Sequence, residues 1–311
     1  MSTWVVAVLV LLAVLAGGAA FMTAMPGRSH TGPLPPLSGE DRALSLRLRL
    51  HVAALAANER NSDLETPARY IEAAFAAQGH KPESQYFESG GRRVRNIEAG
   101  AGKIIVGAHY DTVHGSPGAD DNASGVAVLI ELAAMKLPIR FVAFANEEAP
   151  YFYGPEMGSW AFAKRAWERG EAIRAMFSLE MLGYYRDAPG SQRYPPPLGL
   201  FYPDRADFIA FVGDLGARGL VRRSIESFRR TAQFPSEGVA APAFIPGVTW
   251  SDHWSFRRHG FDAMMITDTA FNRYPHYHLP SDTPDKLDYE RMARVTLALA
   301  AMLKDLANEA R

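Results

Sequence analysis

Short apolar runs alternate with segments of helical periodicity along most of this chain. The apolar or alternating runs predict buried strands at 93–99, 104–108, 139–145, 175–179 and 263–267. Helical spacing of apolar residues predicts helices at 42–58, 67–78, 122–136, 159–169, 204–220 and 288–310. Strands that alternate with helices favour a sheet with helices on both faces. We therefore predict an α/β fold: a single domain over residues 41–311, with a central mixed, mostly parallel β-sheet flanked by helices on both faces.

Residues 1–27 carry no charged side chain and predict an additional N-terminal hydrophobic helix. The apolar stretch from Trp4 to Met25 would span roughly 33 Å as a helix, which is about one hydrocarbon core. It is interpreted as a transmembrane anchor, and a cleaved signal peptide is the alternative. Residues 28–40 are rich in Pro, Gly and Ser and predict a linker. The rest of the chain is then expected outside the cytoplasm, either membrane-anchored on the periplasmic or extracellular side or secreted after cleavage.

Composition excludes several classes of function. The 33 Lys and Arg residues balance 34 Asp and Glu residues, which argues against a nucleic-acid partner. Cysteine is absent, so disulfides, thiolate zinc sites, iron–sulfur clusters and cysteine nucleophiles are excluded. No Gly-x-Ser-x-Gly motif occurs, and Gly100-x-Gly102 lacks the third glycine of a dinucleotide site. No nucleotide cofactor is expected.

Polar residues follow the predicted strands at their carboxyl ends, where open α/β sheets bind ligands. His109-Tyr110-Asp111 follows 104–108, Asn146-Glu147-Glu148 follows 139–145, and Glu180 follows 175–179. Taken singly, each has a structural interpretation: a satisfied histidine, a solvated loop or a buried ion pair. Together they offer imidazole and carboxylate groups, which are common metal ligands.

Two further segments carry candidate chemistry. Asp120 and Asp121 stand together at the predicted start of helix 122–136, where a single acidic N-cap would suffice. Near the C-terminus come Ser251-Asp252-His253 and the run from Tyr274 to Thr283, YPHYHLPSDT. One of the paired aspartates can cap the helix while the other binds a metal.

The ordered set of motifs resembles the M28 family of zinc peptidases. That family includes bacterial aminopeptidases, glutamate carboxypeptidase II and, more distantly, glutaminyl cyclases. The motifs are His-x-Asp, Gly-Ala-Asp-Asp-Asn-x-Ser-Gly, Asn-Glu-Glu, Leu-Glu-Met-Leu-Gly and Tyr-His-x-Pro-Ser-Asp-Thr. The similarity runs from about Arg95 to Tyr289, so 41–311 is interpreted as an M28-like metallopeptidase domain.

The resemblance implies two zinc ions that share Asp121. His109 and Glu180 would complete one zinc site, and Glu148 and His278 would complete the other. Glu180 departs from the family pattern, because many members have Asp there; its longer arm still supplies an oxygen.

The resemblance also implies three catalytic residues. Glu147 matches the general base, Asp111 matches the carboxylate that orients His109, and Tyr277 matches a tyrosine that stabilises the oxyanion. A metal-bridging water attacks the peptide in this scheme, so the expected activity is a dizinc exopeptidase, most simply an aminopeptidase, with a peptide substrate. The alternatives are a single-zinc glutaminyl cyclase and a non-catalytic ectodomain of the same fold.

Overall fold

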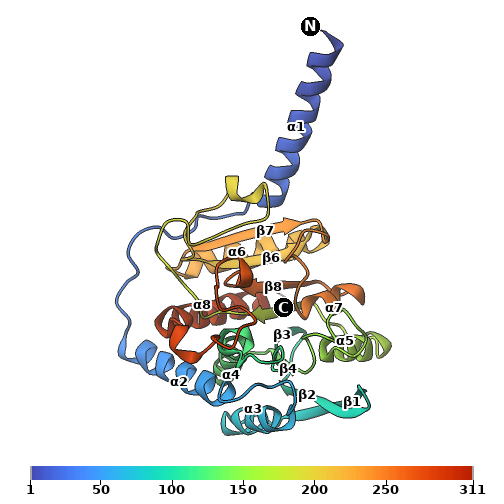
Figure 1. Ribbon diagram of the computed structural model, residues 1–311, viewed down its shortest axis with the longest axis vertical. Helices are drawn as coiled ribbons and strands as arrows, with labels where there is room; N and C mark the ends of the chain where they lie inside the picture. The colour runs from blue at the N-terminus through green and yellow to red at the C-terminus, as the bar shows by residue number, and fades with distance from the viewer. Residues whose placement is uncertain (1, 310–311) are drawn as a thin grey trace.

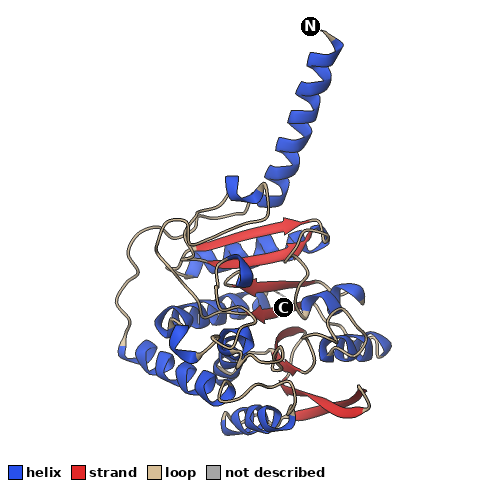
Figure 2. Cartoon of the chain, in the orientation of Figure 1, coloured by secondary structure: helices blue, strands red, loops and turns tan. Residues whose placement is uncertain are grey.

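The apolar runs of the sequence form the centre of one eight-stranded sheet. The computed structural model describes residues 2–309. The strand order is β1-β2-β4-β3-β5-β8-β6-β7. The strands are β1 Glu83–Ser89, β2 Arg92–Gly100, β3 Ile104–His109, β4 Arg140–Phe144, β5 Ala175–Glu180, β6 Ile209–Asp214, β7 Ser236–Ala241 and β8 Ala263–Thr267. Figure 2 shows them as one twisted sheet.

The four central strands β4, β3, β5 and β8 are parallel. Three pairs are antiparallel: β1 with β2, β2 with β4, and β6 with β8. The outer strand β7 is parallel to β6. The mixed sheet with a parallel centre is the one predicted. Its central strands are buried on both faces, as expected from the apolar sequence of residues 104–108 and from residues 175–179, where Ser178 is the one polar residue.

Helices cover both faces of the sheet. They are α1 Thr3–Thr23, α2 Gly39–Leu55, α3 Glu65–Ala77, α4 Gly125–Ala134, α5 Gly158–Glu168, α6 Arg218–Thr231, α7 His253–Arg258 and α8 Tyr289–Asn308. The larger core lies under α2, α3, α4, α6 and α8, around side chains such as Val106 and Phe177. A smaller core on the other face joins α5 and α7 to the sheet through Phe144, Phe162 and Phe256.

Local signals explain where two helices begin. Ser38 and Asp41 form a capping box at the start of α2: each side chain accepts a hydrogen bond from the other residue's backbone N–H. For α3, predicted from residue 67, the start lies two residues earlier. The helix begins at Glu65, and the Asp63 carboxylate accepts hydrogen bonds from the backbone N–H groups of Glu65 and Thr66.

The helix predicted over 204–220 is also wrong. This segment contains β6, the short turn η3 (Leu215–Ala217) and only the first residues of α6. Ile209 and Phe211 face one side of the sheet while Ala210 and Val212 face the other. Because both faces of β6 are buried, all four of these residues are apolar. The sequence therefore lacks the apolar–polar alternation typical of a strand and matches helical spacing instead. β1, β7 and α7 were not anticipated.

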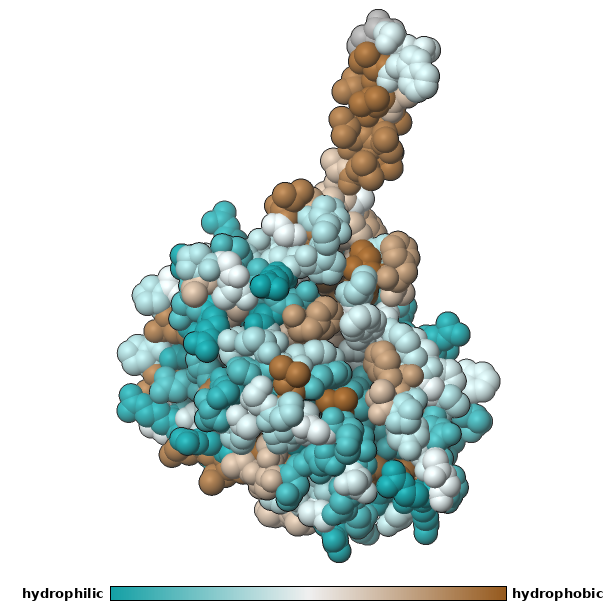
Figure 3. Space-filling view, in the orientation of Figure 1, coloured by the Kyte–Doolittle hydropathy of each residue, from teal (hydrophilic) through white to brown (hydrophobic). Residues whose placement is uncertain are grey.

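α1 projects from the domain, and none of its residues is buried (Figure 1). It is the one helix within residues 2–309 that is long and apolar enough to cross a membrane, and a signal sequence passes the same test. The space-filling view shows its apolar side chains on the visible face (Figure 3). Its lower end contacts β7, the last strand of the sheet.

Candidate active site

The carboxyl ends of the central parallel strands bring the predicted site residues together. His109 ends β3, Glu147 and Glu148 follow β4, and Glu180 ends β5. Asp121 lies in the irregular turn η1 (Ala119–Ser124) before α4, and His278 lies in the loop after β8. Five chain segments that are remote in sequence therefore converge at one edge of the sheet.

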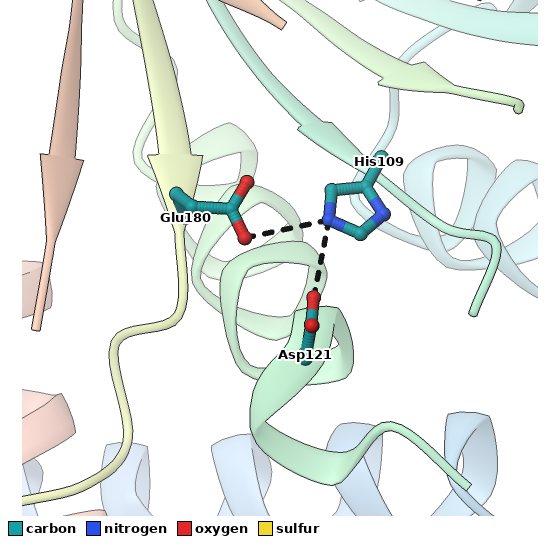
Figure 4. A group of neighbouring side chains, drawn as sticks. All are labelled: His109, Asp121 and Glu180. Carbon is teal, nitrogen blue, oxygen red and sulfur yellow. Dashed lines mark hydrogen bonds and ion pairs between the residues drawn. The ribbon is translucent and has the colours of Figure 1, made fainter. Parts of the chain in front are cut away.

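Asp121 stands between two groups of side chains. Its Oδ1 lies 3.3 Å from His109 Nε2, which is also 3.5 Å from Glu180 Oε1 (Figure 4). Its Oδ2 lies 3.0 Å from His278 Nε2, which is also 3.4 Å from Glu148 Oε1. In each group one nitrogen and two oxygens lie within 4.8 Å of one another. One carboxylate thus offers one oxygen to each of two adjacent ligand sets.

Asp282 holds the Asp121 backbone in place. Its Oδ1 accepts hydrogen bonds from Asp120 N (2.9 Å) and from the Tyr274 hydroxyl (2.7 Å). Its Oδ2 accepts one from Asp121 N (3.1 Å). On the other side, Asn122 donates to the carbonyl of Leu179 in β5. These bonds fix η1 between the loop after β8 and the end of β5.

Asp111 links His109 to the loop after β4. Its Oδ1 lies 3.5 Å from His109 Nδ1, so the opposite ring nitrogen faces Asp121 and Glu180. The same carboxylate accepts the backbone N–H groups of Glu147 and Glu148, each at 3.0 Å. Asp111 can therefore set the histidine tautomer and position both glutamates.

Two hydroxyl-bearing residues complete the surroundings. The Ser251 hydroxyl donates to Glu180 Oε2 at 2.7 Å, which leaves Oε1 facing His109. The Tyr277 ring stacks on His278, with 3.7 Å between ring centroids. Tyr277 is packed between the candidate site and Phe271.

Burial and mutual repulsion disfavour the charged forms of the site glutamates. Burial raises the pKa of Glu147 well above its usual value, and Glu148 and Glu180 add to this effect while His109 opposes it. Burial, together with Asp121, raises the pKa of Glu148 to about 7. Burial also raises the pKa of Glu180. Burial acts the same way on Asp121, but the hydrogen bonds to His109 and His278 hold its pKa below the usual range.

The donor set fits divalent metal ions. Asp121, Glu147, Glu148 and Glu180 are nearly inaccessible to solvent. Within the described residues, their cationic neighbours are His109 and His278, with the buried guanidinium of Arg60 acting on Asp121 and Glu148. Glu148 Oε1 is buried and has no hydrogen-bond partner. Buried carboxylates are costly unless they are protonated, paired or bound to a cation. Mixed imidazole and carboxylate ligands suit zinc and also manganese or cobalt.

An apolar cleft opens beside this cluster. Glu180 and Tyr277 line its end nearest the ligand sets, and Trp250 and Phe271 lie along it. Its walls come from the sheet face formed by β6, β7 and β8, including Ala210 and Met265. A bound substrate can therefore place an apolar side chain there while its reacting group lies at the carboxylates.

The sequence analysis assigned no role to three residues that contact the candidate site or hold its backbone. Ser251 and Asp282 both lie in motifs that the sequence singled out, but only the fold shows which atoms they contact. Arg60 gave no signal: its buried guanidinium donates to the carbonyls of Tyr110 and Gly118 and so holds the segment between His109 and Asp121. In contrast, His253 does not join either ligand set, since its Nε2 donates to the carbonyl of Val248.

Comparison with known proteins gives a family match and a close relative. Residues 91–303 match the family described as Peptidase family M28. The Uncharacterized protein YfbL of Escherichia coli (strain K12) is 41% identical over 261 residues, which cover 78% of this chain and 80% of YfbL. A Probable leucine aminopeptidase of Arthroderma otae is 26% identical over 69% of this chain. This chain spans 56% of the length of that fungal relative.

Solved structures show the same fold. LapB from Legionella pneumophila has a TM-score of 0.67 and 23% identity, over 90% of this chain and 78% of LapB. A glutaminyl cyclase from Porphyromonas gingivalis has a TM-score of 0.64 and 18% identity, over 84% of this chain and 98% of the cyclase. Likeness at this level of identity shows the fold alone, so the side chains of the site must indicate the activity.

Proposed function

Because this chain belongs to peptidase family M28 and is a metallopeptidase by that membership, we propose that it is an aminopeptidase that uses two zinc ions. The observation that carries the proposal is the placement of Asp121, with one oxygen facing His109 and Glu180 and the other facing His278 and Glu148. A single-zinc enzyme would need only one of these sets. Retention of both favours two ions.

The two ligand sets assign the metals to residues. His109, Glu180 and Asp121 would hold one ion, and His278, Glu148 and Asp121 the other. When bound, such ions polarise a carbonyl and lower the pKa of water. Asp111 would keep His109 in the tautomer whose Nε2 faces the ion.

Glu147 is proposed to move the proton. It follows the same strand as Glu148, is nearly inaccessible to solvent and belongs to neither ligand set. As a carboxylate it would accept a proton from the attacking water, and as an acid it would return that proton to the leaving amine. A raised pKa suits a group that must both take and return a proton near neutral pH.

Tyr277 is proposed to stabilise the negative charge that develops on the substrate carbonyl. It stacks on His278 and lines the apolar cleft, so it lies where the cleft meets the ligand sets. Its hydroxyl stays protonated because burial and the surrounding carboxylates raise its pKa far above neutrality. A protonated phenol can donate a hydrogen bond to an oxyanion.

The N-terminal helix supports a proposal about the location of the domain. We propose that α1 anchors the chain in a membrane, with the domain of residues 41–311 outside the cytoplasm. Secretion after cleavage of α1 is the alternative, and the mass of the mature chain distinguishes the two.

A matched pair of substitutions tests the function. Purified full-length chain is assayed with aminoacyl chromogenic substrates, and its zinc content is measured. Glu147→Gln should abolish turnover and retain zinc, whereas Glu168→Gln, at an exposed glutamate of α5, should leave both unchanged. Turnover by the Glu147→Gln variant would exclude Glu147 as the general base. One zinc per chain together with cyclisation of glutaminyl peptides would instead support the cyclase, and no zinc at all would support a non-catalytic domain.

A further inference from the structure

The segment that leaves α1 is fastened to the domain. Arg218, at the start of α6, donates from Nε to the carbonyl of Phe21 at 2.7 Å, and its guanidinium lies 4.0 Å above the Phe21 ring. Arg222, one turn later, donates to the carbonyl of Ala24. Arg229 donates to the carbonyl of Pro26 at 3.1 Å. Three arginines of one helix therefore hold the end of α1 and the residues that follow it.

Apolar contacts reinforce this attachment. Met22 packs against the cluster that forms the wall of the cleft, and Met25 lies against Gly238 in β7. The hydroxyl of Ser29 accepts a hydrogen bond from the backbone N–H of Ser236 at 2.8 Å. The chain is thus attached to the domain from Phe21 to Ser29, so α1 and the domain keep a defined orientation. A bilayer that receives α1 must lie close to the face around its lower end.

That face carries an exposed apolar turn. In η2 (Leu198–Leu200), Leu198 is buried and anchors the turn, whereas Leu200 is 83% exposed and Phe201 is 46% exposed. The hydroxyl of Tyr202 donates to the carbonyl of Gly238 at 2.7 Å, so this loop is tied to the residue that Met25 contacts. Figure 1 shows η2, in yellow, near the lower end of α1, and Figure 3 shows a small apolar group at that place.

We propose that the face around the lower end of α1 is a second membrane contact, in which Leu200 and Phe201 enter the headgroup region of a phospholipid bilayer. A bilayer is the expected partner of this face because α1 is long and apolar enough to cross a membrane and the turn lies near its lower end. Leucine and aromatic side chains partition favourably into the interface. Because Arg218 and Arg222 bond to the carbonyls of Phe21 and Ala24, they would lie near the lipid phosphates when α1 spans a bilayer, a position that arginine side chains favour.

The absence of cysteine permits a direct test. The full chain is reconstituted into phosphatidylcholine and phosphatidylglycerol vesicles with a single fluorophore at Leu200→Cys. A matched control carries it at Leu50→Cys, an exposed leucine of α2, which Figure 1 shows at the end of the domain away from α1. Lipids with a quencher near the headgroup should quench the probe at position 200 severalfold more than the probe at position 50.

Three results would overturn the proposal. Equal quenching at the two positions would show that the turn stays in water. A probe at position 200 that is shielded from iodide but not quenched by lipid would show that protein covers the turn. If mass spectrometry shows that the mature chain lacks α1, nothing would hold this face against a bilayer and the proposal would be wrong. Hydrolysis of a soluble substrate by the same vesicles is a separate measurement, since Leu200 lies outside the site and the cleft, so failure of this proposal leaves the proposed activity untouched.

Discussion

Asp282→Asn should weaken metal binding although Asp282 belongs to neither ligand set. The carboxylate accepts three hydrogen bonds, from the backbone N–H groups of Asp120 and Asp121 and from the hydroxyl of Tyr274. An amide has only one oxygen, so its NH₂ group must face at least one of the two backbone donors. That donor is buried and loses its acceptor.

The magnitude follows from these bonds. An unsatisfied buried N–H costs about 1–3 kcal/mol, and the remaining bonds lose the assistance of a charged acceptor. We expect the free energy of unfolding to fall by about 2–4 kcal/mol. Because Asp121 is then held less firmly, zinc affinity should fall by about 10–100-fold at both ligand sets, as is typical when the partner of a metal ligand is lost.

The assay is zinc competition against a calibrated chelator, combined with denaturant unfolding of the metal-free chain. Asp285→Asn is the matched control, because that carboxylate is 69% exposed, three residues away, and bonds only to Thr283 and Lys286. It should leave zinc affinity and stability near those of the natural chain. If Asp282→Asn binds zinc as tightly as the control, the positioning of Asp121 by Asp282 is refuted.

Three further predictions concern the oxyanion, the pH dependence of stability and the cleft. Tyr277→Phe should lower kcat about 100-fold with a small change in KM, because the variant loses a hydrogen-bond donor used only in the transition state. Steady-state kinetics measures both constants, and a rise in KM as large as the fall in kcat would contradict this role. Burial lowers the pKa of His253 from 6.5 to about 4, so the unfolded chain binds the extra proton first, and the stability held by the neutral ring is complete above pH 6.5 and lost as the pH falls toward 4. His253→Gln should therefore reduce the loss of unfolding free energy between pH 7 and pH 5 by about 2 kcal/mol in urea titrations, and an unchanged pH slope would refute the assignment. Ala210→Leu, which fills the wall of the cleft, should lower kcat/KM for leucyl and phenylalanyl substrates by about tenfold and for alanyl substrates much less; a uniform loss would mean that the cleft does not hold the substrate side chain.

The central strands and the edge of the sheet where the site lies were predictable because each signal is local. A run such as Ile104–Ala108 is apolar because both faces of its strand are buried, and the polar residues that follow it must then stand at the carboxyl edge. The helix predicted over 204–220 was wrong because β6 is likewise buried on both faces. Burial on both faces removes the alternation, and only the neighbouring strands show which period applies.

The residues of the two candidate ligand sets could be proposed from their motifs, but the residues that contact and hold them could not. Asp282 and Ser251 act through atoms that only the three-dimensional arrangement brings together, over separations of 161 and 71 residues. Arg60 lies outside every motif and still holds the segment that leads to Asp121. Spacing along the chain carries no information about such contacts, because they depend on how the loops pack.

The attachment of residues 21–29 has a practical consequence for anyone who shortens this chain. β7 lies at one edge of the sheet, and among residues 2–309 its strand neighbour is β6 alone. The hydroxyl of Ser29 satisfies one of its free backbone groups, and Met25 shields the glycine at its middle. A protein cut after residue 30 would lose these two contacts and expose more of the strand edge, although Tyr202 still bonds the Gly238 carbonyl. The exposed edge can pair with a second molecule, which predicts self-association. A cut before Phe21 would retain that cover while removing most of α1.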